Sequence, residues 1–451
     1  MNKPRRFYLI SLGCPKNLVD SAGLAMLLQR AGYTAADEPE EADLLIVNTC
    51  GFIAPAREES LDVLHELAQG KRPGQRIIAA GCYSQRFPDE LAESVPGIDG
   101  LISTRRWMDI VSLVERLEGT SARRPICHLP ETPTVGQDAL DVPRVAAQGA
   151  SAYLKLADGC RRSCAFCAIP LIKGTAVSRP PDDILADAVW LAERGVRELV
   201  LIAQDTTDYG HDLGMRDGLS DLLERLVAAA PEVDWIRLMY AYPGRVTERL
   251  IETMARHPQI LPYLDIPLQH AHPGLLRRMR RPSDVGRVRR TVERLRAAMP
   301  EIAIRTTFLV GFPGESGAEF RALLNFVAEM EFDRVGVFTY SHEAGVPAAA
   351  LADDVPPEVK EERRERLMAV QQPISLAKNQ ALVGRTLDVL IEGQGEGLSV
   401  GRSYRDAPEI DGLVLVQDEK DQRVELLVGE IVPVRITAAL EYDLVGSPVF
   451  V

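Results

Sequence analysis

The stretch DGCRRSCAFC, residues 158–167, places three thiols within eight residues: Cys160, Cys164 and Cys167. It follows an apolar run at 152–156 that predicts a β-strand. Three soft thiolates with no fourth cysteine or histidine nearby are typical of an iron-sulfur cube that keeps one iron open. The alternative is a zinc site or a group of unrelated buried thiols. Metal ligation is the leading interpretation of this stretch.

The strand before these cysteines begins a long series of strand and helix units. Apolar runs predict six strands, at 152–156, 198–203, 235–240, 263–266, 302–310 and 334–339. Helical patterns separate them, for example at 181–194 and 316–330. This alternation predicts a partial or full α/β barrel, in which functional sites lie at the carboxyl ends of the strands. The three cysteines follow the first strand at that end.

The first 118 residues show a shorter alternation of the same kind. Strands are predicted at 7–12, 43–48, 76–80 and 100–103, and helices at 18–31, 55–69 and 107–117, which indicates a parallel α/β sheet. Cys14, Cys50 and Cys82 each follow one of the first three strands. Because ligands bind outside the carboxyl ends of parallel strands, we expect these thiols to face one crevice. Each thiol taken alone could instead fill the core.

Three further segments complete the chain. The proline-rich residues 119–150, which include Cys127, predict an interdomain linker in which Cys127 is an ordinary thiol. Residues 356–382 predict a charged connector helix that breaks near Pro373. Runs at 386–391, 412–416 and 430–436 predict a small β-barrel. Residues 380–451 hold six basic and 13 acidic residues, a net charge of −7.

Composition narrows the class of protein. The chain has 451 residues, enough for about three domains. Its net charge of −13 argues against a protein whose main task is to coat nucleic acid. No apolar run approaches the roughly 18 residues of a membrane span, and the first residues do not resemble a signal peptide, so a cytoplasmic location without membrane contact is expected. Seven cysteines, an odd number, argue against a disulfide framework.

The spacing Cys-x3-Cys-x-Phe-Cys resembles that of the radical S-adenosylmethionine superfamily. The resemblance implies that Cys160, Cys164 and Cys167 hold a 4Fe-4S cluster whose open iron binds S-adenosylmethionine, with Phe166 beside it. One electron would then cleave this cosubstrate to a 5'-deoxyadenosyl radical, which abstracts hydrogen from an unactivated carbon. A low-potential electron donor such as flavodoxin is also implied.

The N-terminal cysteines and the β-rich tail together resemble the methylthiotransferase branch of that superfamily. The resemblance implies an N-terminal methylthiotransferase domain at 1–118, a linker at 119–150, a radical barrel with its connector helix at 151–380 and a TRAM β-barrel at 381–451. It also implies that Cys14, Cys50 and Cys82 hold a second 4Fe-4S cluster. That cluster would carry the sulfur species, methylated from S-adenosylmethionine, that joins the substrate radical. All six cysteines would then be metal ligands and catalytic residues.

Three motifs resemble the RimO type of this branch, which methylthiolates the β-carbon of an aspartate in a small-subunit ribosomal protein. They are SLGCPKN at 11–17, AQDTTDYG at 203–210 and DIPLQH at 265–270. Transfer-RNA enzymes of the branch usually have another residue pair after the first cysteine, and an acidic tail suits a basic protein better than RNA. The nearest alternative is a transfer-RNA adenosine methylthiotransferase. A non-enzymatic iron-sulfur carrier or a zinc-stabilised binding module is the alternative from another class.

Five further residues are candidates for binding S-adenosylmethionine. Gln204 and Asp205 end the second barrel strand, where the superfamily contacts the amino group of the cosubstrate, and Gln269 ends the fourth. Gly311 ends the fifth strand and could allow the nucleoside to approach the backbone closely. Arg179 could meet a carboxylate. A strand-end cap, a tight turn or a solvated charge would explain these residues equally well.

Other polar residues near the strand ends have open roles. His270 could face the same cavity or be a hydrogen-bonded structural histidine. The run RRMRR at 277–281 could meet carboxylates or form a solvated face. Lys173, in IPLIKG at 169–174, stands where the family more often has arginine, and it keeps the charge but not the bidentate geometry.

Overall fold

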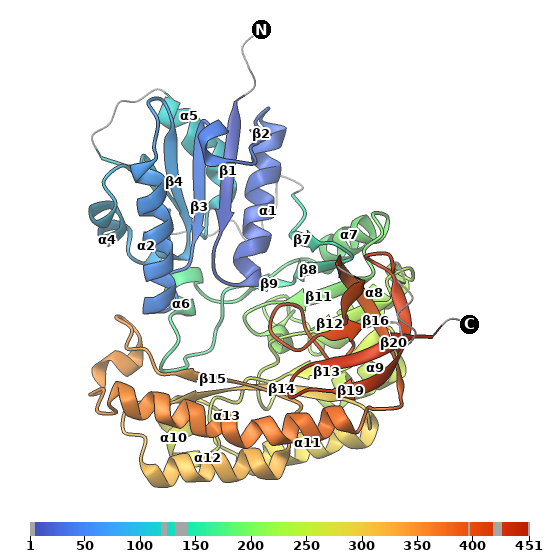
Figure 1. Cartoon of the computed structure of the whole chain (residues 1–451). Coiled ribbons are helices and arrows are strands. Elements are labelled where there is room, and N and C mark those ends of the chain that lie inside the picture. Colours follow the sequence, from blue (N-terminus) through green and yellow to red (C-terminus); the bar gives the residue numbers. More distant parts are fainter. Residues whose placement is uncertain (1–4, 119–123, 131–141, 396, 418–425, 450–451) are drawn as a thin grey trace.

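The computed structural model describes residues 5–118, 124–130, 142–395, 397–417 and 426–449. Three bodies follow one another along the chain: an N-terminal α/β sheet, a central open barrel and a closed C-terminal β-barrel. Figure 1 shows the N-terminal sheet (blue) above the central sheet, with the C-terminal barrel (red) beside it. The predicted fold class is confirmed.

The N-terminal sheet contains parallel strands in the order β2-β1-β3-β4-β5-β6. Alternate residues of β3 face opposite sides: Leu44 and Ile46 pack in the core under α1 and α5, and Leu45 and Val47 pack under α2 and α4. The strands are β1 (Arg6–Ser11), β2 (Thr34–Ala35), β3 (Leu44–Thr49), β4 (Arg76–Gly81), β5 (Gly100–Ser103) and β6 (Ile126–His128). The helices are α1 (Pro15–Arg30), α2 (Ala54–Gln69), α3 (Cys82–Arg86), α4 (Pro88–Ser94) and α5 (Ile110–Glu118).

Helix α1 begins at Pro15, directly after Cys14, and not at residue 18 as the apolar pattern predicts. Proline is suited to the first turn because its fixed φ is helical and the first N–H has no partner within the helix. The earlier start brings Lys16 and Asn17 into the helix, and both are buried. The first turn of α1 therefore becomes part of the surroundings of Cys14.

The proline-rich segment that we expected to be only a linker contributes an edge strand to each of two sheets. Strand β6 adds to the N-terminal sheet and carries Cys127, which is exposed. Strand β7 (Val145–Gln148) pairs antiparallel with the first barrel strand. Apolar contacts explain both strands, since Ile126 packs against the N-terminal core and Val145 is buried in the central one. Positions 119–123 and 131–141 of this segment lie outside the described residues.

The central sheet has the order β15-β14-β13-β12-β11-β8-β7 and does not close, so the barrel is a partial one. All six predicted strands are present: β8 (Ser151–Lys155), β11 (Glu198–Ile202), β12 (Trp235–Leu238), β13 (Ile260–Asp265), β14 (Ala303–Val310) and β15 (Arg334–Thr339). Short pieces follow β8: β9 (Ala157–Asp158), α6 (Ile169–Lys173) and β10 (Val177–Ser178). The remaining helices are α7 (Pro181–Ala192), α8 (Gly218–Ala229), α9 (Glu248–Arg256), α10 (Pro273–Arg278), α11 (Val285–Ala298) and α12 (Gly317–Met330).

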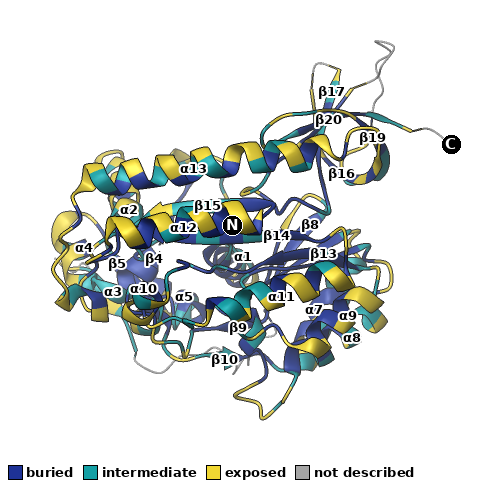
Figure 2. Cartoon of the chain, turned by 90° about the horizontal axis from the view of Figure 1, so that it is seen from below, coloured by how far each residue is buried: buried dark blue, intermediate teal, exposed yellow. Residues whose placement is uncertain are grey.

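Helix α13 (Pro357–Gln380) is continuous, and the predicted break at Pro373 is wrong. Tertiary hydrogen bonds hold the helix on both sides of the proline: Gln371 Nε2 donates to the carbonyl of Phe332 at 2.8 Å, and Ser375 Oγ accepts from Arg334 at 3.2 Å. Figure 2 shows that one face of α13 is exposed along its length. No helix in the described part of the chain is both long and apolar enough to cross a membrane.

The C-terminal barrel is closed in the order β16-β17-β18-β20-β19. Its strands are β16 (Thr386–Gly395), β17 (Leu398–Ser403), β18 (Val414–Val416), β19 (Ile431–Ala439) and β20 (Leu444–Pro448). The sequence did not indicate β17 or β20, because each contains a glycine, which normally weakens a strand. In β17 this glycine, Gly401, is needed because the backbone of β16 at Leu390 crosses where a Cβ would stand.

Buried ion pairs attach this barrel to the central sheet. Arg402, at the end of β17, pairs with Glu198 at 2.6 Å, and Arg237 pairs with the same carboxylate at 2.7 Å. Burial alone would raise the pKa of Glu198, but the two guanidinium groups lower it to about 2. Because Glu198 is the first residue of β11, this junction lies away from the carboxyl ends of the strands, which stay open toward the N-terminal domain.

Candidate iron-sulfur active site

A cavity of about 430 Å³ lies between the N-terminal domain and the carboxyl ends of the central strands. Its walls come from loops that follow strands of both sheets. All six cysteines predicted from the sequence line it: Cys14, Cys50, Cys82, Cys160, Cys164 and Cys167. The two sets of thiols, expected at two separate strand edges, therefore face a single space.

Close contact between three loops assembles the N-terminal set. At Gly13, where φ is +88°, a Cβ would lie only 2.8 Å from Cys50 Cβ, so glycine allows the first loop to approach the second. Asn17 Nδ2 donates to main-chain carbonyls just beyond β1 and at the end of β3, at 3.0 and 3.1 Å. Its Oδ1 accepts from Cys82 Sγ at 3.5 Å. Asn17 thus connects the three strand ends that carry the thiols.

Main-chain hydrogen bonds to the residues that directly follow α6 and α10 hold the second set, the loop with Cys160, Cys164 and Cys167. The N–H of Cys160 donates to the carbonyl of Gly174 at 3.0 Å, and the N–H of Ala165 donates to the carbonyl of Met279 at 2.9 Å. This loop is therefore fixed at both ends by neighbouring segments of the central domain.

Burial raises the pKa of four of these thiols, so these four need a stabilising partner such as a metal to ionise. Burial raises the pKa of Cys160 to about 11 and that of Cys82 and Cys167 to about 12, and it also raises the pKa of Cys50. At neutral pH these groups would stay protonated unless a bound metal stabilised the thiolates.

Single metal ions fit the thiols less well than clusters do. Within the part of the chain that the structure describes, no three His, Cys, Asp or Glu side chains converge closely enough to share one ion. A cube distributes its thiolates over different irons, so its ligands stand farther apart than those of zinc. The donor chemistry of each set, three thiols with no fourth protein ligand beside them in the sequence, fits a cube with one open iron.

Two of the candidates for cosubstrate binding line the cavity, and a third lies beside it. Gln204 and Gln269 are in the lining, and Gln269 has a left-handed backbone with φ of +72°. Asp205 does not line the cavity, because it is paired with Arg162 Nε at 2.8 Å. Asp205 therefore fixes a cation that lines the cavity.

Three other candidates point elsewhere. A Cβ on Gly311 would collide with the side chain of Lys360, so this glycine makes room for α13 and does not line the cavity. Arg179 is buried and donates to Asp187 at 2.8 Å. His270 is a buried structural histidine that interacts with Glu315 at 3.1 Å. Gly311 and His270 stand at strand ends, as the sequence indicated, but neither they nor Arg179 line the cavity.

Lys173 belongs to a buried ionic cluster between the two domains. Its ammonium pairs with Asp20 of α1 at 2.9 Å and with Asp158 at 3.1 Å, and Lys155 pairs with Asp20 at 2.6 Å. Burial would raise the pKa of Asp158, but the two lysines lower it well below its usual range. A lysine at position 173 can contact both carboxylates, so its position joins the N-terminal domain to the central one.

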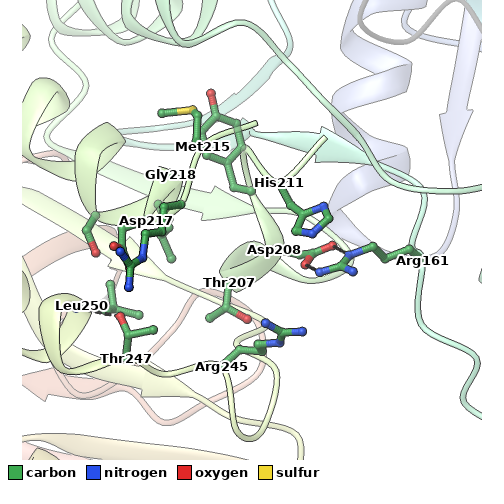
Figure 3. Close-up of a pocket in the computed structure, with 14 residues that line it drawn as sticks. Arg161, Thr207, Asp208, His211, Met215, Asp217, Gly218, Arg245, Thr247 and Leu250 are labelled. Atoms are coloured by element: carbon green, nitrogen blue, oxygen red, sulfur yellow. Dashed lines mark hydrogen bonds and ion pairs between the residues drawn. The ribbon is translucent and has the colours of Figure 1, made fainter. Parts of the chain in front are cut away.

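A smaller hollow of about 70 Å³ lies next to the cysteine loop and contains no cysteine. Figure 3 shows Arg161 pointing to Asp208 there, with an Nη2–Oδ1 distance of 2.5 Å. Arg162 reaches the same carboxylate at 3.0 Å. Asp208 therefore anchors the two arginines that follow Cys160 and helps to orient the loop.

Sequence reasoning assigned no role to several residues that line the cavity: Lys16, Asn17, Tyr240, Tyr242 and Phe338. Lys16 and Asn17 stand within the motif at 11–17, and the two tyrosines follow β12. Their position after a strand was a usable signal. The apolar pattern of the sequence did not indicate that Phe338, which lies within β15, would reach the cavity.

Three family models match this chain. Residues 6–103 match the family described as Uncharacterized protein family UPF0004, residues 154–327 match the Radical SAM superfamily, and residues 383–449 match the TRAM domain. Among solved structures, the radical S-adenosylmethionine methyltransferase TsrM from Kitasatospora setae is similar, with a TM-score of 0.57 over 90% of this chain and 82% of that one. At 15% identity, this similarity shows a shared fold.

Curated relatives match the chain over nearly its whole length. The Ribosomal protein uS12 methylthiotransferase RimO of Roseiflexus sp. (strain RS-1) is 51% identical, over 98% of this chain and 97% of the relative. The protein of the same name from Chloroflexus aurantiacus is also 51% identical, over 98% and 99%. The chain belongs to the RimO family of radical S-adenosylmethionine methylthiotransferases.

Proposed function

We propose that this protein uses S-adenosylmethionine and two iron-sulfur clusters to add a methylthio group to the β-carbon of an aspartate of ribosomal protein uS12. The observation that carries the proposal is the single cavity lined by two sets of three cysteines. Relatives of about the same length that are named uS12 methylthiotransferases support the choice of substrate.

The two sets divide the work. Cys160, Cys164 and Cys167 hold one cluster, and Cys14, Cys50 and Cys82 hold the other. When bound, the first cluster supplies an electron to S-adenosylmethionine and the second supplies the sulfur site. The protein contributes a fixed separation between them, because both sets belong to the same cavity and the ionic cluster around Asp20 joins their domains.

Part of the cavity wall is apolar, which favours the exclusion of water from a reactive radical. Behind the thiols lies an apolar cluster that draws residues from both domains, with Phe52 and Phe166 packed against it. Its buried members include Cys82, Ala165, Ala168, Ile172, Leu275, Met279 and Phe312. Excluding water prevents side reactions and strengthens the electrostatic contacts inside the site.

Gln204, Gln269 and Arg281 are the side chains that suit the cosubstrate. Arg281 Nη1 is 3.6 Å from Cys164 Sγ, and its Nε is buried without a hydrogen-bond partner among the described residues. A guanidinium at this place suits the carboxylate of S-adenosylmethionine. Asp205 acts on the site through Arg162, and Gly311 and Arg179 support the fold.

The chemistry also determines the partners. Reduction of the first cluster requires a low-potential electron donor such as flavodoxin. A ribosomal substrate, together with seven free cysteines, favours the reducing cytoplasm. The acidic C-terminal barrel suits a basic ribosomal protein.

A competition between substrates tests this function. Reduced enzyme is incubated anaerobically with S-adenosylmethionine and either uS12 or transfer RNA, and each is weighed by mass spectrometry. We expect uS12 alone to gain about 46 Da, the mass of SCH3 replacing H. A gain on RNA alone would show a transfer-RNA enzyme, and an absence of 5'-deoxyadenosine in every reaction would show a non-enzymatic carrier.

The iron and sulfide content of the protein tests the number of clusters. Anaerobically reconstituted protein should hold about eight irons and about eight sulfides per chain, since each cube contains four of each. About four irons would leave only one cluster and contradict the division of labour between the two cysteine sets.

A further inference from the structure

Lys16 is a buried cation on which Cys14 and Asp265 act through space, but no described carboxylate forms an ion pair with it. It stands in the first turn of α1, lines the cavity beside Cys14 and is only 4% exposed. Its Nζ lies 3.0 Å from the centre of the Tyr240 ring. Among the described residues, no hydrogen bond or ion pair of this ammonium is found. A charge buried in this way is costly unless something in the cavity pairs with it.

The other cations of the cavity are already engaged or belong to the cosubstrate side. Arg162 and Lys173 have aspartate partners at 2.8 and 2.9 Å. Arg281 lies beside Cys164 and donates to the carbonyl of Pro267. Lys16 is the cation that the N-terminal domain presents to the cavity without a carboxylate of its own.

The ring below Lys16 is held by a strained backbone. Tyr240 has a φ of +61°, a left-handed conformation that is unfavourable for an aromatic residue. Two hydrogen bonds keep it there: its N–H donates to Asp265 Oδ2 at 3.2 Å, and its carbonyl accepts from the N–H of Thr206 at 3.1 Å. The strain fixes the ring against the ammonium and so fixes the place where an anion can bind.

We propose that Lys16 binds the side-chain carboxylate of the substrate aspartate and selects aspartate over neutral residues. The inference deepens the proposed function and rests on it. The β-carbon is bonded directly to the carboxyl carbon, so an ammonium that holds the carboxylate also orients the β C–H bonds. The cavity then contains two cations without carboxylate partners, Arg281 and Lys16, for the carboxylates of cosubstrate and substrate.

Lys16→Met tests this role because methionine has nearly the same length and no charge. The substrates are uS12 and a uS12 variant in which the modified aspartate is asparagine. We expect the wild-type holoenzyme to prefer the aspartate form, and Lys16→Met to lower kcat/KM for that form by about 100-fold while the asparagine form changes little. Equilibrium binding of the two forms should show the same loss of preference.

Lys378→Met is the matched control. Lys378 lies outside the cavity, where it pairs with Asp333 at 3.6 Å, so its loss should leave the preference unchanged. If Lys16→Met does not bind its iron-sulfur clusters, the same measurements are made with Lys16→Gln, which keeps a polar side chain without the charge.

A Lys16 variant that keeps the preference for aspartate would overturn the inference. Loss of S-adenosylmethionine binding would also overturn it, because Lys16 would then be assigned to the cosubstrate. If wild-type enzyme modifies neither form, the proposed function itself fails.

Discussion

The two cysteine sets line the same cavity but are assembled in different ways. Cys160, Cys164 and Cys167 come from one loop of eight residues, whereas Cys14, Cys50 and Cys82 are separated by 36 and 32 residues and come from three strand ends. The first set is a local feature of the chain. The second exists only if the parallel sheet forms with β1, β3 and β4 side by side.

Because the two sets are assembled independently, a change that removes one cluster should leave the other cluster bound. Each set has its own supports: main-chain hydrogen bonds to the residues after α6 and α10 hold the loop, and Asn17 holds the strand ends. What they share is the cavity and the ionic cluster that joins the domains. Four changes, ordered by the expected size of the effect, test this separation.

Cys164→Ala should have the largest effect, because the loop set is expected to start the reaction. Formation of 5'-deoxyadenosine and methylthiolation of uS12 should both fall by at least about 1000-fold, and iron should fall from about eight to about four per chain. Chromatography of the nucleoside and iron analysis measure both effects. Cys127→Ala, at an exposed cysteine outside the cavity, should change neither. Continued 5'-deoxyadenosine formation in Cys164→Ala would refute the radical assignment.

Cys50→Ala should divide the two activities. Because Cys50 belongs to the strand-end set, we expect 5'-deoxyadenosine formation within about threefold of wild type, and loss of methylthiolation by at least about 100-fold. The nucleoside and the mass of uS12 are measured in the same reaction. Equal loss of both products would mean that the two sets do not work separately.

Asp20→Asn tests the connection between the domains. Removing this carboxylate leaves the buried Lys155 and Lys173 with Asp158, which should lower the free energy of unfolding by about 3 kcal/mol. Both clusters should still bind, but methylthiolation should fall about tenfold because their separation is less well fixed. Denaturation and iron analysis are the measurements. Asp182→Asn, in an exposed pair with Arg225, is the control, and an equal effect there would contradict the argument.

The acid stability of the junction at Glu198 provides a test in a region remote from both cysteine sets. Because its pKa is lowered from 4.5 to about 2 in the folded protein, its contribution to stability is complete above pH 4.5 and is lost as the pH falls toward 2. Over this pH range the free energy of unfolding should fall by about 3 kcal/mol, which denaturation of the apoprotein would measure. Glu198→Gln should lack this part of the pH dependence and should keep both activities near neutral pH. An unchanged acid profile in Glu198→Gln would contradict the assignment.

The sequence predicted most of the fold but fewer details of the site. Apolar runs identified all six barrel strands, since five of them are buried over most of their length, and β15, although only partly buried, still reads as an apolar run. Pro373 was misjudged because α13 donates a hydrogen bond to the carbonyl of Phe332 and accepts one from Arg334, and these partners are remote in sequence. Strand β17 was missed because the need for Gly401 arises from a neighbouring strand.

The same limit applies to the candidate site residues. A position at a strand end predicted the correct edge of the sheet for Gln204, Gln269 and Gly311, but it could not predict which way a side chain turns. Gly311 faces α13, and the two glutamines face the cavity. Lys16 was visible within the motif at 11–17, but its lack of a partner became apparent only when every neighbour was in place.

Local patterns identified the two cysteine sets, the three-body organisation and the strand ends on which the thiols stand, because spacing and hydrophobic period are local properties of a chain. The arrangement in three dimensions was needed to show that both sets share one cavity, that Asp20 joins their domains through Lys155 and Lys173, and that Lys16 forms no ion pair with any described carboxylate. The physical reason is that pairing of buried charges depends on which residues meet across domains, and no local pattern encodes that meeting.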